Sequence, residues 1–448
     1  MLEGLEICEV PFSRVIGNDI VRMESEFYNS NTVSYKNTVK ASQIIDFSQY
    51  GTSKELNEMG EGYPVLRLNE FNYSFISHPD KYCSLLDIDA YHGLQLKKDD
   101  VLICRTNGNP KFVGRSAIVP KDYDYAFASY LFRIRPNRKY INSATLVAFL
   151  NSKYGRLEIE KYSMVGNQAN FSPAKFREIS IPVFSKDLND KIEDITYRAF
   201  QKLEMSESLY SEAANNMLEC LDLNDFTASS NSCNVKTLKE SFIETGRLDA
   251  EYYQPKYDSL FEKLKGFPTA TIKEIATIQK SIEPGSDAYQ EEGIPFIRVA
   301  NLSKFGLSNS DVKLETTKFA DTIRPQKDTI LLSKDGSVGI AYKMEETQDV
   351  ITSSAILHLQ LTTPNVLPDY LTLVLNSIVV KLQAERDAGG SIIQHWKPSE
   401  IKHVIIPILP MNEQQMIANK IKQSFKMRED AQDLLLQAKC IIETAIEK

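Results

Sequence analysis

Two long stretches of the chain carry apolar residues at α-helical spacing and contain no internal proline or glycine. They run from 189 to 221 and from 412 to 446. Apolar positions three, four and seven residues apart form a stripe suited to one partner helix. At 1.5 Å per residue each helix would be roughly 50 Å long, too long for one small domain to cover its stripe. We therefore expect the two helices to pack against each other.

The first stripe is uniformly apolar, whereas Ser424 and Arg428 interrupt the beginning of the second. The stripe positions are Ile192, Ala199, Leu203, Tyr210, Ala213, Met217 and Cys220 in the first helix, and Ile417, Ser424, Arg428, Leu435, Ala438, Ile442 and Ala445 in the second.

A mixed segment with short apolar runs precedes each long helix. Residues 100–104 and 328–332 are apolar runs bounded by turn residues, which is typical of buried strands. Helix-like stretches follow at 144–154 and 369–383, and each mixed segment ends with an Ile-Pro strand. This order predicts an α/β (α+β) globular unit before each helix.

The chain is a tandem repeat of two copies of about 224 residues, and a repeat of this kind decides the architecture. The offset between copies is 225 residues at both ends and larger in the middle, where loops absorb insertions. Four pairs of segments carry the repeat: 22–28 with 247–253, 63–68 with 294–299, 102–108 with 330–336, and 171–173 with 396–398.

Composition narrows the class of protein. The chain has 448 residues, of which 42% are hydrophobic and 25% charged, as in soluble globular proteins. It contains no run of eighteen apolar residues and begins with an acidic segment, so we expect no membrane span and no signal peptide. The six cysteines form no C-x-x-C pair. They predict free thiols in a reducing compartment, and hence a cytoplasmic protein.

Charge is distributed unevenly. The net charge of −8 disfavours a non-specific nucleic-acid binder. However, residues 97–139 carry ten basic and four acidic side chains, whereas residues 186–222 carry four basic and nine acidic ones. The basic segment could hold DNA while the acidic helix holds a protein, so the charge permits DNA binding without establishing it.

Two segments resemble the specificity subunits of type I restriction–modification systems. The stronger is residues 406–415, in which an Ile-Pro strand, a second proline and Asn-Glu-Gln-Gln lead into the long helix. Residues 166–172, before Ile181-Pro182, resemble its upstream counterpart. The order of segments matches over nearly the whole chain. One departure is residues 184–190, which lack the second proline and the Glu-Gln-Gln of the second copy.

The resemblance implies two α/β target-recognition domains separated by a long antiparallel two-helix coiled coil. We expect the first domain at residues 1–185 and a central spacer helix at 186–224. The second domain is expected at 225–410, with a linker at 225–246, and a C-terminal spacer helix at 411–448.

The resemblance also implies a function. Each domain would read half of a split site in double-stranded DNA, and two methyltransferase subunits would dock on the chain. Motor-nuclease subunits are optional further partners. The S-adenosylmethionine and the adenine-methylating chemistry would belong to the methyltransferase subunits, so this chain is expected to hold no cofactor of its own.

Candidate DNA-contacting residues lie mainly in the loops after the predicted strands. Arginine pairs with guanine, asparagine and glutamine with adenine, and lysine neutralises phosphate. The same residues are also common in polar turns and helix caps, which is the alternative interpretation for each. The candidates are Arg67, Asn69, Arg105, Thr106, Asn107, Asn109, Lys111, Arg115, Gln168, Asn170, Arg298, Asn301, Lys334, Asp335, Ser337, Gln394 and Lys397.

Motifs for catalysis are missing from the sequence. Pro79-Asp80 followed by Gln95-Leu96-Lys97 has a nuclease-like pattern, but the second copy lacks a counterpart, which favours chance. No P-loop and no methyltransferase signature occurs. We expect a non-catalytic subunit, with Trp396 and Phe171 as core aromatics. The alternative function is a tandem protein-binding adaptor without DNA specificity, which the acidic net charge favours.

Overall fold

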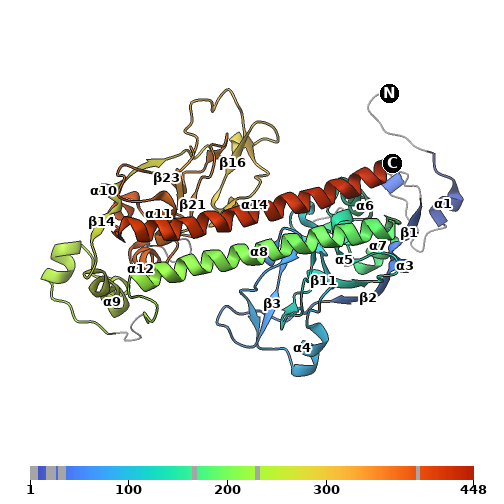
Figure 1. The fold of residues 1–448 in the computed structure, drawn as a ribbon, viewed down its shortest axis with the longest axis horizontal. Coiled ribbons are helices and arrows are strands. Elements are labelled where there is room, and N and C mark those ends of the chain that lie inside the picture. The colour runs from blue at the N-terminus through green and yellow to red at the C-terminus, as the bar shows by residue number, and fades with distance from the viewer. Residues whose placement is uncertain (1–8, 17–26, 29–36, 164–168, 228–232, 390–393) are drawn as a thin grey trace. The chain divides into compact units, whose positions relative to one another are not determined.

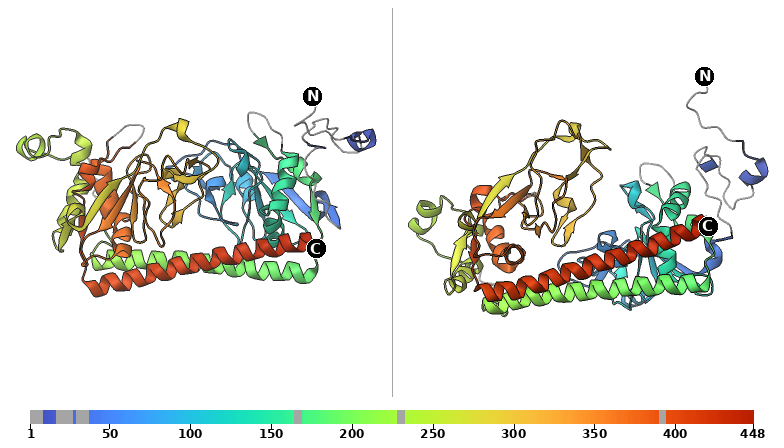
Figure 2. Two further views of the ribbon diagram at one scale, coloured as in Figure 1. Left: turned by 90° about the horizontal axis from the view of Figure 1, so that it is seen from above. Right: turned by 45° about the horizontal axis from the view of Figure 1, so that its top comes forward.

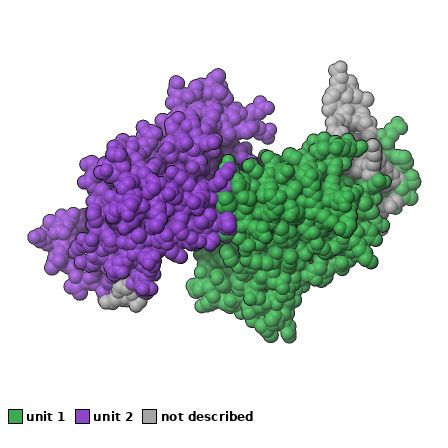
Figure 3. Space-filling model, viewed as in Figure 1, with its two compact units in different colours: residues 1–204, 427–448 green, residues 205–426 purple. Residues whose placement is uncertain are grey.

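A computed structural model describes residues 9–16, 27–28, 37–163, 169–227, 233–389 and 394–448. It contains two compact units (Figure 3). Unit 1 consists of Met1–Glu204 with Met427–Lys448, and unit 2 of Met205–Lys426. Residues 22–26 of the first repeat segment and residues 166–168 of the upstream motif lie outside the described residues, as does Gln168 among the candidates.

Unit 1 is built on a six-stranded sheet with the order β2-β11-β7-β9-β5-β4. Figure 1 labels its strands β2 and β11. A three-stranded sheet, β10-β3-β6, and the strand pairs β1–β13 and β8–β12 accompany it. The strands are β1 Thr38–Lys40, β2 Ile45–Tyr50, β3 Tyr63–Leu66, β4 Phe71–Asn72, β5 Phe75–Ile76, β6 Tyr82–Cys83, β7 Val101–Cys104, β8 Thr106–Asn107, β9 Ser116–Ile118, β10 Ala126–Phe127, β11 Leu131–Pro136, β12 Ala169–Asn170 and β13 Ser180–Pro182.

Unit 2 has a four-stranded sheet with the order β15-β23-β20-β21 and a three-stranded sheet with the order β19-β16-β22. The pairs β14–β24 and β17–β18 complete its strands. The strands are β14 Thr269–Thr271, β15 Ala276–Lys280, β16 Ile294–Ile297, β17 Leu302–Ser303, β18 Gly306–Leu307, β19 Lys313–Leu314, β20 Ile330–Ser333, β21 Ala341–Lys343, β22 Ile351–Thr352, β23 Ile356–Leu361 and β24 Ile405–Pro407.

Helices flank these sheets in both units. In the first repeat they are α1 Phe12–Ile16, α3 Ala41–Ile44, α4 Ile88–Leu94, α5 Ser143–Leu150, α6 Lys153–Tyr162, α7 Pro173–Glu178 and α8 Lys186–Cys220. In the second they are α9 Pro255–Leu264, α10 Ile272–Ile275, α11 Pro368–Leu375, α12 Ile378–Asp387, α13 Pro398–Ile401 and α14 Met411–Glu447.

The two units share one topology. The order β2-β11-β7-β9 corresponds to β15-β23-β20-β21, and β10-β3-β6 corresponds to β22-β16-β19. The correspondence includes strand direction, because β10 runs parallel to β3 as β22 does to β16. The predicted fold class, tandem α/β units with long helices, is confirmed.

Each helix-like stretch predicted at 144–154 and 369–383 is in fact two helices. The first ends at Leu150 and the next begins at Lys153, with Ser152 as its N-cap. Between them Asn151 turns its side chain to the backbone of Ser116 in β9, donating at 3.0 Å and accepting at 3.3 Å. Asn376 makes the same two contacts with Ala341 in unit 2. A helical period alone does not reveal such a break, because both helices bury apolar residues.

In unit 1 the first part of α8 packs against the last part of α14 (Figure 2). Ile192 and Ala199 of α8 share an apolar core with Ala431 and Ala438 of α14, all 2% exposed or less. An ion pair between Lys202 and Asp430 at 2.8 Å lies beside this core. The stripe of α8 in this unit is therefore covered by a segment more than 200 residues away in sequence.

In unit 2 the same two helices pair in antiparallel directions. Ser206 of α8 faces Ser424 of α14, and further along α8 Glu212 pairs with Lys420 at 2.6 Å. The Ser424 hydroxyl donates to the Ser206 carbonyl at 2.7 Å, and both serines are fully buried. The serine that interrupts the predicted stripe is thus part of the packed face, because its hydroxyl has a partner inside the contact.

A buried amide attaches the start of each long helix to the globular part of the unit in which that helix begins. In unit 2 the Gln414 side chain accepts from the Leu367 backbone N–H at 2.9 Å and donates to the Leu409 carbonyl at 2.8 Å. In unit 1 Asn189 bonds Asn142 and the Phe184 carbonyl in the same way, each at 3.3 Å. The departure at residues 184–190 therefore changes the sequence of the helix start but keeps this contact.

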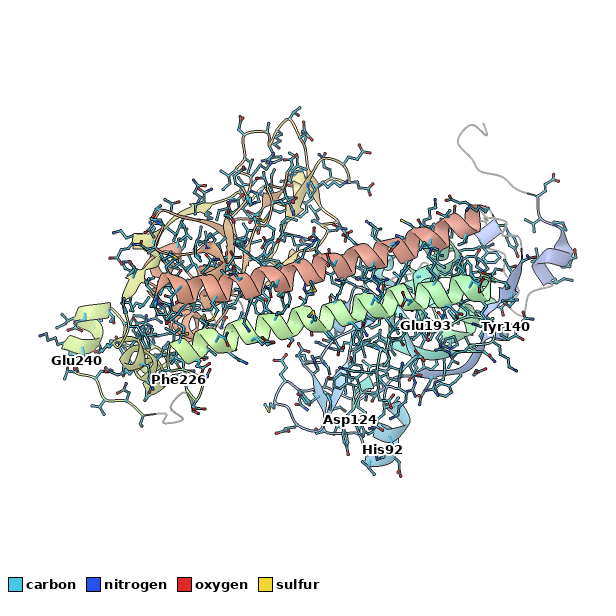
Figure 4. The ribbon with its side chains drawn as sticks, in the orientation of Figure 1. His92, Asp124, Tyr140, Glu193, Phe226 and Glu240 are labelled. Atoms are coloured by element: carbon cyan, nitrogen blue, oxygen red, sulfur yellow. The ribbon has the colours of Figure 1, made fainter. Side chains whose placement is uncertain are left out.

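A bidentate ion pair adds to the attachment in unit 1. Arg138 donates to both carboxylate oxygens of Glu193, at 2.7 and 2.9 Å. Figure 4 shows Glu193 on α8, beside the globular part. Each long helix begins in one unit and ends in the other. The sequence predicts each helix as a separate segment, whereas in the structure each helix is divided between the two units.

The helix pairing in unit 2 predicts opposite outcomes for two adjacent residues of α14. Ile417 is fully buried, whereas Met416 is 45% exposed. Ile417→Asp places a carboxylate in the apolar contact and should lower the free energy of unfolding by more than about 4 kcal/mol. Met416→Asp should change it by no more than about 0.5 kcal/mol. Urea unfolding of the full chain measures both, and equal effects would contradict the packing described.

Candidate nucleic-acid interface

Three backbone hydrogen bonds organise the candidate loops of unit 1 around the turn at residues 128–130. Ala128 donates to the Leu66 carbonyl at 2.9 Å, and Arg105 donates to the Tyr130 carbonyl at 2.7 Å. Phe171 then donates to the Arg105 carbonyl at 2.8 Å. Arg67, which follows Leu66, and Arg105 are therefore held on the same turn.

Unit 2 repeats this scaffold around the turn at residues 353–355. Ser353 donates to the Ile297 carbonyl at 2.8 Å, and Lys334 donates to the Ala355 carbonyl at 2.9 Å. Trp396 donates to the Lys334 carbonyl at 2.8 Å. Arg298 is thus the counterpart of Arg67, and Lys334 is the counterpart of Arg105.

The strand register corrects the loop equivalence expected from sequence. Cys104 pairs with Leu131, and Ser333 pairs with Ile356, so Cys104 and Ser333 correspond. The expected alignment placed Arg105 opposite Ser333, one residue away. Runs of similar apolar residues do not distinguish a one-residue shift, whereas pairing with a neighbouring strand fixes it.

The corrected register shows that unit 1 carries an insertion. The Arg115 carbonyl accepts from the Cys104 backbone N–H, as the Ile340 carbonyl does from that of Ser333, and Gly114 and Gly339 both have positive φ. Residues 105–115 thus correspond to residues 334–340, with Asn109–Phe112 as the four additional residues. The insertion contains Lys111 and the short helix Pro110–Phe112.

Arg105 lies over an exposed aromatic ring. Its guanidinium is 5.3 Å from the centre of the Tyr50 ring, and Tyr50 is 47% exposed. The guanidinium forms no hydrogen bond or ion pair with any residue that the structure describes. Beside it, Thr106 pairs with Asn170 and Asn107 with Ala169 across β8 and β12. The structure thereby brings four of the candidate positions together.

The remaining candidates of this loop either leave their side chains at least partly exposed or stabilise the loop backbone. Arg115 stacks on Phe112 at 5.2 Å. Asn107 and Asn109 each accept a backbone N–H within the loop, at 2.8 and 3.0 Å, and therefore shape it. Lys111 is exposed.

Arg156 is a positioning residue that sequence reasoning missed. It reaches from α6 and donates to the Val113 carbonyl at 2.8 Å and to the Lys111 carbonyl at 3.3 Å. Burial lowers the pKa of Arg156, and the nearby Arg115 lowers it further. Arg156 lies about forty residues from the loop in sequence, so spacing carries no signal for this contact.

Arg67 is neutralised within unit 1. Its guanidinium contacts Glu70 at 2.8 Å and also pairs with Asp80, and Glu70 is only 6% exposed. Asn69 is exposed in the short turn that Arg67 begins. These contacts fit the alternative interpretation of Arg67, in which its side chain stabilises its own turn.

The loop of unit 2 contains an internal charge network. Lys334 pairs with Asp335, and the other oxygen of Asp335 lies 2.9 Å from the His395 ring. Burial acts to raise the pKa of the Asp335 carboxyl, but the contacts with Lys334 and His395 together outweigh it and lower that pKa. Lys334 is 11% exposed. At neutral pH the Lys334–Asp335 pair carries no net charge.

The other candidates of unit 2 are mostly exposed. Ser337 and Gln394 are exposed, and their carbonyls accept bonds from Ser333 and Gly336. Lys397 is 73% exposed, with its ammonium 3.6 Å from Glu400. Asn301 accepts from the Arg298 backbone at 3.1 Å and so supports the turn.

Arg298 itself is exposed. Its side chain forms no ion pair or hydrogen bond within the described part of the chain. It therefore differs from its counterpart Arg67 by being available to a ligand.

Several cations of the basic segment 97–139 are occupied by neighbours. Arg133 and Arg135 both contact the fully buried Asp100, at 3.1 and 2.7 Å. Lys121 pairs with Glu204 at 2.5 Å. The basic count of this segment therefore overstates the charge available for a ligand.

The second repeat matches a known family. Residues 265–432 fit the family described as the type I restriction modification DNA specificity domain. The specificity subunit of the type I restriction enzyme EcoKI from Escherichia coli (strain K12) is 20% identical over 394 residues, which are 84% of this chain and 78% of that relative. The second repeat is therefore similar to a type I specificity domain, and most of the chain is similar to one specificity subunit.

Two further specificity subunits are similar to parts or most of the chain. The specificity subunit of StySPI from Salmonella potsdam is 24% identical over 135 residues, which are 30% of this chain but only 29% of that relative. The crystal structure of the S subunit of a type I restriction–modification system from M. genitalium aligns with 93% of this chain and 96% of its own, at 13% identity and a TM-score of 0.39.

The specificity-family match includes β14 to β24 and the first part of α14. It therefore contains the loop at 334–340, Arg298 and the amide contact of Gln414. Among the described residues, no group of three or more His, Cys, Asp or Glu side chains could hold a metal ion. In the same part of the chain, no helix is both long and apolar enough to cross a membrane.

The geometry of the loop in unit 1 predicts unequal effects for two glycine substitutions. Gly114 has φ +78°, and an added Cβ would collide with the Ile159 side chain, whereas a Cβ at Gly108 meets open space. Gly114→Ala should lower the free energy of unfolding by about 1–3 kcal/mol, and Gly108→Ala by less than about 0.5 kcal/mol. Chemical denaturation of both variants tests this, and a Gly114→Ala chain as stable as Gly108→Ala would contradict the loop geometry.

Proposed function

We propose that this chain is the DNA-reading subunit of a type I restriction–modification complex, with each unit reading one part of a bipartite target. One observation carries the proposal: both units hold two basic side chains at corresponding positions of the same scaffold, and the second unit contains the match to the type I specificity domain. Cationic side chains on loops are suited to DNA phosphates and base edges.

The differences between the two scaffolds favour two different half-sites. Unit 1 carries Asn109–Phe112, which unit 2 lacks, and the residues after Arg105 and Lys334 differ. Since sequence is read by loop side chains, two unlike loops imply an asymmetric target. The long helices α8 and α14 would fix the spacing, because a helix of 35 residues is about 52 Å long, compared with about 35 Å per turn of DNA.

We further propose that two methyltransferase subunits dock on this chain and that motor-nuclease subunits can join them. The S-adenosylmethionine and the methyl-transfer chemistry would reside in the methyltransferase subunits, and this chain would contribute no catalytic group. The helix α14 offers a docking surface, since its residues Met411 and Leu436 are 42% and 59% exposed.

Co-expression of the full chain with type I methyltransferase subunits tests the proposal against the adaptor alternative. The DNA-reading subunit should co-purify with an S-adenosylmethionine-dependent adenine methyltransferase, and the complex should bind duplex DNA with an affinity that falls steeply as salt rises. The methyltransferase subunits expressed alone are the control for DNA binding. Co-purification without any gain in DNA binding over that control would favour the adaptor and overturn the proposal.

A further inference from the structure

The two units differ in which of their corresponding basic side chains is neutralised. In unit 1 Arg67 is paired with Glu70 and Asp80, whereas Arg105 has no described ionic partner. In unit 2 the pattern is reversed. Lys334, the counterpart of Arg105, is paired with Asp335, whereas Arg298, the counterpart of Arg67, is exposed and unpaired.

An ion pair inside the protein competes with a phosphate for the same cation. To bind phosphate, Arg67 would have to leave Glu70, a carboxylate that is 6% exposed and would lose its partner in a poorly hydrated place. Lys334 would likewise have to leave Asp335, whose carboxylate is 22% exposed. Arg105 and Arg298 face no such cost.

The surroundings of the unpaired arginine in unit 1 add positive charge. Arg115 lies close enough to Arg156 to lower the pKa of that guanidinium, and it has no described carboxylate partner. The guanidinium of Arg105 stacks on the ring of Tyr50. A planar guanidinium held on an aromatic face is preorganised to donate toward a ligand.

The strand before the unpaired arginine of unit 2 is connected through the backbone to a second basic region. The turn at 353–355 that bonds Ile297 also bridges Ile282, through Ser353. Beside Ile282 an open cleft of about 340 Å³ is lined by Lys280 and Lys318, with Asp321 as its carboxylate. Two ammonium groups beside this open cleft suit a phosphate oxygen.

Given the proposed DNA-reading function, we infer that the two units contact DNA phosphates through opposite members of the same pair of positions: Arg105 in unit 1 and Arg298 in unit 2. The paired residues Arg67 and Lys334 serve the protein's own loops. The corresponding positions of the two units are thus not interchangeable, although their backbone scaffold is.

Salt-dependent binding of the full chain to a mixed-sequence DNA duplex tests this inference. Each phosphate contact contributes about 0.9 to the slope of log affinity against log salt. Arg105→Gln and Arg298→Gln should each reduce the slope by about 0.9, and the double variant by about twice that. The charge-neutral control Lys334→Gln/Asp335→Asn should leave the slope at the wild-type value, and Asp335→Asn alone should raise it by releasing Lys334.

Arg67→Gln/Asp80→Asn is the matched control for Arg298→Gln, and it should also keep the wild-type slope. Thermal melts establish that each variant is folded. If the Arg67 variant does not fold, the Lys334/Asp335 comparison still decides the inference. It is overturned if the Lys334/Asp335 control loses as much slope as Arg105→Gln, or if Arg298→Gln loses none. Failure of the wild-type chain to bind DNA, alone or in its complex, would instead overturn the proposed function and this inference with it.

Discussion

The apolar stripe of a long helix has to be covered, and this constraint shapes both units. The part of α8 in unit 1 lies against residues 427–448, and the part of α14 in unit 2 lies against residues 205–220. In each unit the helix pair therefore joins two stretches of chain that are far apart in sequence, although only unit 1 is discontinuous. Burial of Ala199 with Ala431 in one unit, and of Ser206 with Ser424 in the other, shows that small side chains serve this contact in both.

The amide contacts of Asn189 and Gln414 connect the paired helices to the globular parts. Each amide bonds the segment that enters the first sheet-flanking helix, α5 or α11. Because a buried amide without partners is costly, the helix start and the domain are held in one arrangement. The same domain presents the turn at 128–130 or 353–355, from which the basic loops extend. Helix pairing, domain and candidate interface thus form one connected structure in each unit.

The sequence predicts the tandem repeat, the α/β class and the two paired helices, because these depend on periodic patterns and on segments that recur. It also identifies Trp396 and Phe171 as core aromatics, and both are fully buried. The break between α5 and α6 escapes it, since Asn151 looks like a tolerable helix residue until its bonds to Ser116 are seen.

The candidate interface is less predictable because it depends on partners distant in sequence. Arg67 and Arg298 are equivalent in sequence, but only Arg67 has a buried glutamate three residues later, where Arg298 has Asn301. The sequence alignment misplaces Arg105 by one residue relative to its counterpart Lys334, and only the strand pairing corrects this shift. Composition cannot reveal that Arg133 and Arg135 are occupied by Asp100. Charge counts identify the region, and contacts decide which cations in it are available.

The central claim is that two separate units each read part of one DNA target. Mapping methylated adenines in cells that contain this chain and its methyltransferase subunits tests it most directly. We expect two specified blocks separated by unspecified bases of fixed number, and deletion of Asn109–Phe112 should alter one block and leave the other unchanged. A single continuous block, or a deletion that alters both blocks, would contradict it.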